Sequence, residues 1–278
     1  MPVRFTVLGG AGFIGRHLAA SLHAGGHEVV APARNEKLSS DSLGNVIYCI
    51  GVTADFRVRP FDTVRAHVTV LSEILEQARF ASLLYLSSTR VYAKASNASE
   101  AAALPVTTLD PSDLYNLSKL MGESLCLNCG RENVRIARIS NVVGFDADSD
   151  NFISTLIKQA LDGTIVLQSA PGSSKDYIAL EDVLKMLPCI ALEGRDRIYN
   201  VASGNNLRHA DLVARLQSLT GCRVKAAKDA PAQTFPLICI ERLRREFEFC
   251  PADPLAELSE LVAAYRQQLC RSTSTKNR

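Results

Sequence analysis

Tyr115 and Lys119 are the residues whose types and spacing point most directly to chemistry. They stand four positions apart in the segment YNLSK, so on a helix their side chains share one face. A free tyrosine has a pKa near ~10, and a lysine charge about 4 Å away would lower that pKa and favour the phenolate. Such a tyrosine can exchange a proton with a sugar or alcohol hydroxyl group near neutral pH. The same spacing also occurs on solvated helix faces. The pair therefore indicates catalysis only together with other motifs of the chain.

A glycine-rich turn near the N-terminus could hold the phosphates of a dinucleotide. A β-rich run at residues 4–8 leads into GGAGFIG, whose glycines have the spacing GxxGxxG, and a helical pattern of apolar residues follows. Glycines in this context permit a tight turn and close approach of a pyrophosphate, while the helix N-terminus attracts the phosphate charge. The alternative is a glycine turn that binds nothing. The candidate cofactor-binding residues here are Gly9, Gly12, Phe13, Ile14 and Gly15.

The end of the second expected strand, at residues 28–31, indicates which dinucleotide is preferred. NAD enzymes usually place an acidic residue near this point to hold the ribose 2′-hydroxyl group, whereas an arginine accommodates a 2′-phosphate. Arg34 follows this strand and therefore favours NADP, with NAD still possible. An arginine in an ordinary surface loop is the alternative.

Together with further segments, these features resemble the extended short-chain dehydrogenase/reductase family, in its branch of NAD-dependent epimerases and dehydratases that modify nucleotide sugars. The segment LSSTRVY at residues 86–92 is similar to the strand end that carries the family's catalytic Ser or Thr, and Ser88 is the residue that matches. The resemblance implies that Ser88 holds the reacting sugar oxygen and that Tyr115 is the acid/base. It also implies that Lys119 tunes the phenol and holds the ribose of the nicotinamide half. A strand-end serine that only caps the next turn is the alternative.

The resemblance also implies residues that bind the substrate. The segment RISNVVG at residues 138–144 is similar to the family segment in which an Asn meets the substrate diphosphate, and KDYI at residues 175–178 resembles the family's RDYI. The implied substrate-binding residues are Thr89, Asn141 and Lys175. A lysine in place of the family's arginine keeps the charge but loses a bidentate grip on phosphate.

Departures from the family pattern narrow the expected activity. The dehydratase branch carries an Asp-Glu pair directly after its catalytic Thr, and this chain has Thr89 and Arg90 there, which disfavours loss of water. His67 stands where the family usually has Asn. The loop at residues 35–45 is too short for the usual third strand and its helix. These departures predict a nicotinamide pocket that differs in detail from the family's, but they do not change the expected class of enzyme.

Composition and charge argue against several other functions. A net charge of +2, without a basic run that contains aromatic residues, does not indicate nucleic-acid binding. No run of 18 apolar residues predicts a membrane span, and the first residues open a strand rather than a signal peptide. The eight cysteines are scattered, and the CxxC at residues 126–129 lacks the second ligand pair of a zinc site, so no metal is expected. We expect a cytoplasmic enzyme with reduced thiols.

Strand-like and helix-like stretches alternate up to about residue 140, which predicts an α/β fold with a doubly wound parallel (Rossmann) sheet. Strands are expected at residues 4–8, 28–31, 46–50, 83–86 and 134–139, and helices at 13–24, 64–78 and 114–129. Residues 1–140 would form the NAD(P)-binding domain, to which residues 178–202 would return. Residues 141–278 would form a smaller C-terminal substrate-binding lobe. The second and third helices pair across a dimer in the family, which implies a homodimer.

The expected function is that of an NAD(P)-dependent oxidoreductase acting on a nucleotide-linked sugar, in particular a 4-ketoreductase with a Ser/Tyr/Lys site. An NADP preference favours net reduction, because epimerases keep NAD bound and recycle it. Two alternatives stay open, namely an NDP-sugar 4-epimerase with tightly bound NAD and reduction of a carbonyl that is not on a sugar. A non-catalytic dinucleotide-sensing protein is the alternative from a different class, and the intact Ser, Tyr and Lys argue against it.

Overall fold

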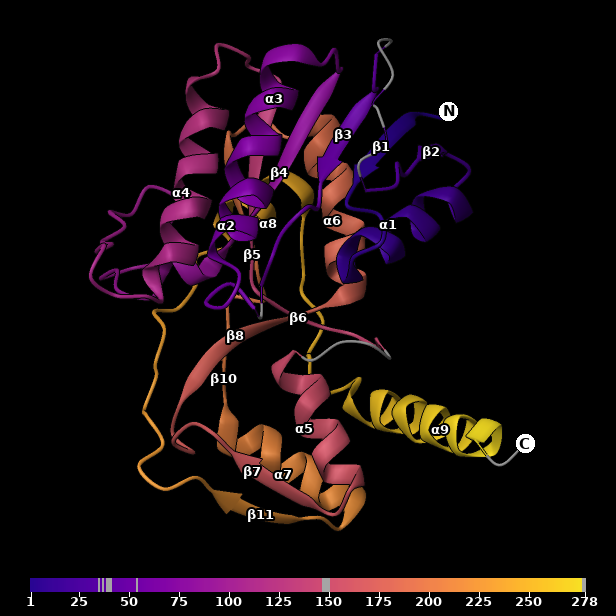
Figure 1. Cartoon of the computed structure of the whole chain (residues 1–278), viewed down its shortest axis with the longest axis vertical. Helices are drawn as coiled ribbons and strands as arrows, with labels where there is room; N and C mark the ends of the chain where they lie inside the picture. Colours follow the sequence, from indigo (N-terminus) through magenta and orange to yellow (C-terminus); the bar gives the residue numbers. More distant parts are fainter. Residues whose placement is uncertain (35, 37, 39–41, 54, 147–150, 277–278) are drawn as a thin grey trace.

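A six-stranded parallel sheet forms the centre of the larger part of the molecule (Figure 1). The structure is a computed structural model that describes residues 1–276 except 35, 37, 39–41, 54 and 147–150. The strand order is β2-β1-β3-β4-β5-β9, and all neighbouring pairs are parallel. The strands are β1 Arg4–Leu8, β2 Glu28–Val30, β3 Asn45–Tyr48, β4 Ser82–Ser88, β5 Val134–Ile139 and β9 Ile198–Val201. The predicted α/β class with a parallel Rossmann-type sheet is confirmed.

Helices cover both faces of this sheet (Figure 1). One face carries α1 Phe13–Ala24 and α6 Leu180–Glu193, and the other carries α3 Val70–Gln77 and α4 Asp113–Asn128. Since neither face meets water, the central strands are apolar on both sides, and every residue of β3 is buried. This covering explains why the central strands appear in the sequence as apolar runs rather than as alternating patterns.

The helix predicted at residues 64–78 differs from the structure in its start and in its interior. It begins with α2 Pro60–Val64 and passes through a π-helical turn, η1 Arg65–Thr69, before it becomes α3. Proline suits the first helical position, because the N–H that it lacks would have no partner there. π-helical turns are rare and concentrate at functional sites. This one carries His67.

β2 and β3 lie on either side of β1 and are joined by residues 31–44. In the described residues of this connection the chain forms neither a strand nor a helix, as expected from its length. Residues 35, 37 and 39–41 of the predicted loop lie outside the described part of the chain.

A smaller group of elements lies next to the carboxyl edge of the large sheet (Figure 1). It comprises a three-stranded sheet of order β10-β8-β6, a parallel pair of β11 with β7, and three helices around a separate buried cluster. These elements are β6 Asn141–Val143, α5 Phe152–Leu161, β7 Thr164–Leu167, β8 Ser174–Ala179, β10 Asn206–Arg208, α7 His209–Thr220, β11 Arg223–Ala226 and α9 Leu258–Lys276. The last short helix, α8 Glu241–Phe247, contacts β9 instead. The domain division expected from the sequence stays a proposal. Within the described ranges, none of the helices has the length and apolar character needed to cross a bilayer.

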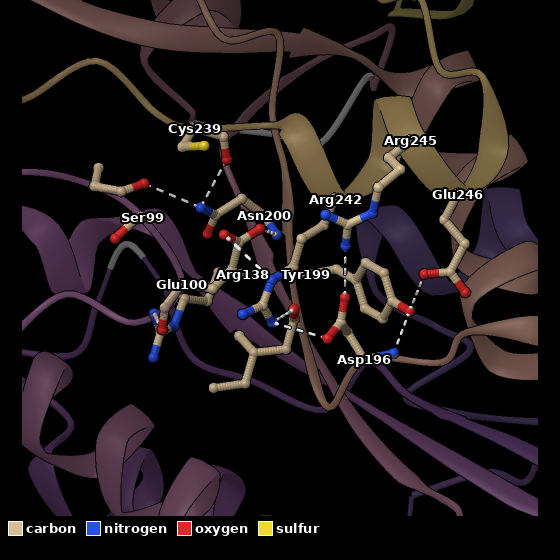
Figure 2. Close-up of polar contacts among 12 residues, drawn as sticks. Ser99, Glu100, Arg138, Asp196, Tyr199, Asn200, Cys239, Arg242, Arg245 and Glu246 are labelled. Carbon is tan, nitrogen blue, oxygen red and sulfur yellow. Dashed lines mark hydrogen bonds and ion pairs between the residues drawn. The ribbon is translucent and has the colours of Figure 1, made fainter.

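Asn200, fully buried on β9, joins segments that are far apart in the sequence (Figure 2). Its amide nitrogen donates to the carbonyl oxygens of Ala98 and Cys239, at 3.1 and 2.9 Å. Its amide oxygen accepts a hydrogen bond from the Tyr92 hydroxyl group at 2.8 Å, and that hydroxyl group accepts one from Arg138 on β5 at 2.7 Å. A buried polar network therefore connects two long loops to the last strands of the sheet.

Candidate active site

β1 runs into a glycine turn that packs tightly against the end of β3 and then starts α1. Gly9 has a φ of +84°, and a Cβ atom there would lie 2.8 Å from the backbone nitrogen of Ile50. A Cβ atom on Gly15 would lie 2.9 Å from the carbonyl carbon of Gly9, so both positions require glycine. The N–H groups that follow Gly12 at the start of α1 have no side-chain cap, which leaves them free for a phosphate. The turn therefore fits the pyrophosphate of a dinucleotide.

A cavity of about 570 Å³ adjoins this turn, the end of β4 and the 3₁₀ turn η2 Thr89–Tyr92. Its volume is typical of sites for small ligands. The predicted site residues that line it are Gly12, Phe13, Ile14, Gly15, Ser88, Thr89, Tyr115, Lys119, Asn141 and Lys175. Gly9 and Arg34 do not line the cavity. Gly9 belongs to the glycine turn and packs against the backbone of Cys49 and Ile50.

Ser88, Tyr115 and Lys119 meet at this cavity. The Ser88 hydroxyl group accepts a bond from the backbone N–H of Arg90 at 3.2 Å and lies close enough to the Tyr115 phenol to lower its pKa, so it both caps η2 and faces the acid/base candidate. One turn of α4 further on, the Lys119 amine donates to the carbonyl oxygen of Leu86 at 2.8 Å. The amine lies 6.0 Å from the centroid of the Tyr115 ring. Tyr115 and Lys119 are only 5% and 4% exposed, so water is nearly excluded from both.

Burial sets the protonation states of this pair. It raises the pKa of Tyr115 above the ordinary value of 10.0, although the hydrogen bond with Ser88 and the charge of Arg90 act in the opposite direction. Burial also lowers the pKa of Lys119 to about 7. Tyr115 is therefore a protonated phenol at neutral pH. The expectation of a Tyr115 pKa lowered by Lys119 is wrong here, because burial dominates and Arg90 is the cation that opposes it.

His67 is a residue of this site whose role the sequence did not reveal. η1 places its ring perpendicular to that of Tyr115, with the centroids 5.2 Å apart. Its Nε2 accepts a bond from the backbone N–H of Val52 at 3.3 Å, which assigns the ring proton to Nδ1, the donor to the Ser118 hydroxyl group at 2.8 Å. Burial and the charge of Lys119 lower the pKa of His67 to about 2. A neutral imidazole thus holds the loop after β3 against α4. The only sequence signal for this role of His67 was that it stands where the family usually has Asn.

Thr89, Asn141 and Lys175 lie on the wall of the cavity formed by η2, β6 and β8. Asn141 begins β6, which pairs directly with β8, the strand that carries Lys175. The Lys175 amine lies 5.4 Å from the centroid of the Phe235 ring, and its pKa is lowered by burial and by the charge of Arg90. An amide and a cation on paired strands are suited to receive a phosphate group.

Arg34 is exposed in the turn that follows β2. Two residues later, the Glu36 carboxylate folds back and accepts a bond from the backbone N–H of Ala33 at 2.7 Å. The sequence prediction considered Arg34 and missed Glu36. A cation and an anion therefore lie near the strand end at which the ribose 2′ position of a dinucleotide is recognised.

Comparisons with known proteins agree with this geometry. The family model described as "NAD dependent epimerase/dehydratase family" matches residues 5–202. The chain belongs to this family. One curated relative is GDP-6-deoxy-D-mannose reductase of Pseudomonas aeruginosa, which is 28% identical over 261 residues. That alignment covers 82% of this chain and 84% of the relative.

Solved structures share the fold of this family member. MoeE5 in complex with UDP-glucose and NAD has a TM-score of 0.81 at 22% identity, over 96% of this chain and 99% of that one. RMD from Pseudomonas aeruginosa complexed with NADPH has a TM-score of 0.73 at 21% identity, also over 96% and 99%. As a member of the family, the chain is an NAD(P)-dependent enzyme.

Proposed function

We propose that the chain is a nucleotide-sugar 4-ketoreductase that prefers NADPH. The observation that carries the proposal is the buried Tyr115 phenol, which lies beside Ser88 on a cavity that adjoins a dinucleotide-type glycine turn and whose pKa burial raises. A protonated phenol suits reduction, because the ketone oxygen must gain a proton as its carbon gains a hydride. The 28% identical relative, named as a reductase of a nucleotide-linked deoxysugar, supports the same direction.

Each residue of the site has a part in this reaction. The nicotinamide, when bound, supplies the hydride. The Ser88 hydroxyl group holds the C4 oxygen of the sugar, and Tyr115 gives that oxygen its phenolic proton. A charged Lys119 then stabilises the phenolate that remains, and its pKa of about 7 lets it return a proton to the phenolate near neutral pH. Asn141 and Lys175 hold the diphosphate of the substrate.

A screen of nucleotide sugars tests this proposal, with turnover followed by the absorbance of NADPH or NADH. We expect Tyr115→Phe to lower kcat by about 10²- to 10⁴-fold, the usual contribution of a positioned acid/base. Cofactor affinity should stay the same, because the change removes a single hydroxyl group. Tyr199→Phe on β9, which removes a buried hydroxyl group bonded to the Glu246 carboxylate of α8, is the matched control and should keep its turnover. Unchanged turnover in Tyr115→Phe would exclude the assigned role.

Arg34 carries the proposed preference for NADPH. We expect Arg34→Ala to weaken NADPH binding by about 10-fold or more, the effect of losing a charge-assisted bond, and to leave NADH binding unchanged. Fluorescence titration of both cofactors measures this. Arg215→Ala, on the exposed face of α7, controls for general loss of positive charge. Equal weakening of the two cofactors would remove the reason to prefer reduction over epimerisation.

An NDP-sugar 4-epimerase with tightly bound NAD is the second candidate, and the Glu36 carboxylate favours it. A carboxylate near the end of β2 can hold the ribose 2′-hydroxyl group of NAD and repel a 2′-phosphate. Copurified NAD, interconversion of two sugars without net consumption of NADPH, and loss of NAD from Glu36→Gln would support this candidate. Steady oxidation of NADPH would support reduction if the protein also lacks copurified NAD, does not interconvert the two sugars, or shows no effect of Glu36→Gln on NAD binding.

A cytoplasmic homodimer belongs to the same proposal. Val64 on α2 and Met121 and Leu127 on α4 are exposed apolar residues, which supports an interface along these helices. Light scattering of the purified chain measures its oligomeric state, and a monomer at micromolar concentration would contradict this part.

A further inference from the structure

Arg90 is a cation in the cavity wall whose guanidinium has no partner among the described residues. It lines the cavity in η2, directly after Ser88 and Thr89. Its side chain makes no hydrogen bond or ion pair with any residue that the structure describes, and its Nε is buried without an acceptor. Leaving a buried donor unpaired costs free energy, so an unpaired guanidinium at a ligand site indicates a missing anion.

The aromatic rings around Arg90 fix where such an anion would lie. The guanidinium carbon is 5.9 Å from the centroid of the Tyr115 ring and 5.4 Å from that of Phe56. The rings attract the cation but supply no oxygen acceptor, so its N–H donors stay available to a ligand. An anion held by these donors is therefore close to the group that exchanges the proton.

In the part of the chain that the structure describes, no carboxylate pairs with the Arg90 guanidinium. Asp110 and Asp113 act on Arg90 from a distance, but both are paired with the Lys94 amine, each at 2.8 Å. Lys175 feels the charge of Arg90, which helps to lower its pKa. Arg90 and Lys175 are thus two cations that repel each other across the cavity. Each is suited to bind an anionic group of the ligand.

The chemistry of a nucleotide sugar distinguishes these two anionic groups. The diphosphate is attached at C1, at the opposite end of the ring from C4, and Asn141 and Lys175 are placed to receive it. A cation beside Tyr115 lies instead near C4 and its neighbour C5. A carboxylate on C5, as in a hexuronic acid, is the anion that reaches this position.

We infer that Arg90 binds a carboxylate on the sugar and that the substrate is a nucleotide-linked hexuronic acid or its C4-oxidised form. The inference rests on the part of the proposed function that reduction and epimerisation share, hydride exchange at C4 of a nucleotide sugar. The edge of the guanidinium offers two parallel N–H donors, whose geometry matches a carboxylate.

Matched pairs of ligands test the inference with the full-length protein and bound cofactor. Each pair consists of an NDP-hexose and the corresponding NDP-hexuronic acid, in UDP, GDP and dTDP forms. Calorimetry gives Kd for both members, and hydride transfer from C4 to NAD(P)⁺ gives kcat/KM. We expect the acid of the preferred nucleotide to bind about 10- to 100-fold more tightly than the neutral sugar, the effect of a hydrogen-bonded charge pair.

Variants of Arg90 assign this preference to a single side chain. Arg90→Met should bind both members of the pair with similar affinity, and Arg90→Lys should keep part of the preference, because it keeps the charge without the fork. Arg57→Met is the matched control, since Arg57 is an exposed neighbour that contacts the same Phe56 ring and hydrogen-bonds Ser112. It should keep the full preference.

The outcomes separate this inference from the proposed function. If no nucleotide sugar binds or reacts, both fail. If the wild-type protein binds the two members equally, or if Arg90→Met weakens both by the same factor, the anion at Arg90 is the diphosphate or absent, and only the inference is overturned. A preference for the acid that survives in Arg90→Met overturns it as well.

Discussion

Tyr115 and Lys119 share a region from which water is excluded, and this controls the proton chemistry of the site. Burial favours the uncharged form of each group, so the phenol keeps its proton and the pKa of the amine falls to about 7. A phenol in this state can donate, and an amine with such a pKa can resupply the proton near neutral pH. The pair is suited to the reduction of a carbonyl without a preformed phenolate.

The buried Lys119 should make stability depend on pH. The unfolded chain holds this proton up to a pKa near 10.5, whereas the folded chain releases it near 7. Between these values the unfolded state binds more protons, so the free energy of unfolding rises with pH. One proton contributes at most about 1.4 kcal/mol per pH unit, which is roughly 2 kcal/mol between pH 7.5 and 9.0. Lys119→Met should lack this rise when urea unfolding is measured at both pH values.

The same measurement on an exposed lysine is the control for Lys119→Met. Lys185→Met, on the outer side of α6, should follow the pH profile of the wild-type protein. Parallel curves for the wild-type protein and Lys119→Met would show that the amine is not desolvated as described.

Helix α4 carries Tyr115 and Lys119, the proposed catalytic pair, and its close approach to β4 depends on one small residue. A Cβ atom on Gly122 would lie 2.5 Å from the hydroxyl oxygen of Tyr85 on β4 and 2.8 Å from the carbonyl oxygen of His67 in η1. Gly122 lies one turn after Lys119. The helix, the strand and the π-helical turn therefore meet at a point that admits no side chain.

Gly122→Ala should destabilise the protein in spite of the better helix propensity of alanine, which is worth about 1 kcal/mol. The added methyl group must displace a buried ring or backbone, and overpacking of this kind costs about 1–3 kcal/mol. Because the shift moves α4 relative to β4, kcat should fall more than cofactor affinity. Ser124→Ala, at an exposed position of the same helix, is the control for thermal unfolding and kinetics. A Gly122→Ala protein of wild-type stability would contradict the packing.

Sequence periodicity predicted the regular elements but not the irregular one. The structure has α1 at residues 13–24 and β5 at 134–139, as predicted, because apolar spacing and the glycine turn determine them locally. The π-helical turn η1 leaves the apolar pattern of its helix intact, so periodicity does not predict it. Pro60 was a usable signal for the earlier start of that helix, since proline favours the first turn.

Across the whole molecule, the parts of the site that escaped prediction depend on contacts between distant segments. Glycine spacing and the Tyr-Lys pair are visible within a few residues, and the structure brings them to one cavity. The pKa of Lys119 depends on burial by several elements, and the place of Arg90 depends on Phe56, which comes from a separate loop. A single sequence does not show such long-range packing, so it does not predict Arg90 beside Tyr115, where this cation lies about as near to the ring as Lys119 does.

Asn200 links the cavity wall to the large sheet, and Figure 2 shows its contact with Cys239. Ile238, next to Cys239 in the segment before α8, lines the cavity, and Asn200 bonds the carbonyl oxygen of Cys239. Tyr92, at the end of η2, bonds the Asn200 amide oxygen. One buried side chain thus anchors two segments that meet the wall of the cavity, on the side where we propose that the sugar binds.

Asn200→Ala should therefore affect stability and substrate binding together. It leaves two buried carbonyl groups and a hydroxyl group with one partner fewer each, and we expect a loss of about 2–4 kcal/mol in the free energy of unfolding. KM for the sugar nucleotide should rise by more than KM for the cofactor, because the loosened segments meet the sugar. Urea unfolding and steady-state kinetics measure the two effects, with exposed Asn205→Ala as the control. Equal changes in both KM values would indicate that Asn200 supports the fold as a whole rather than the sugar side of the cavity.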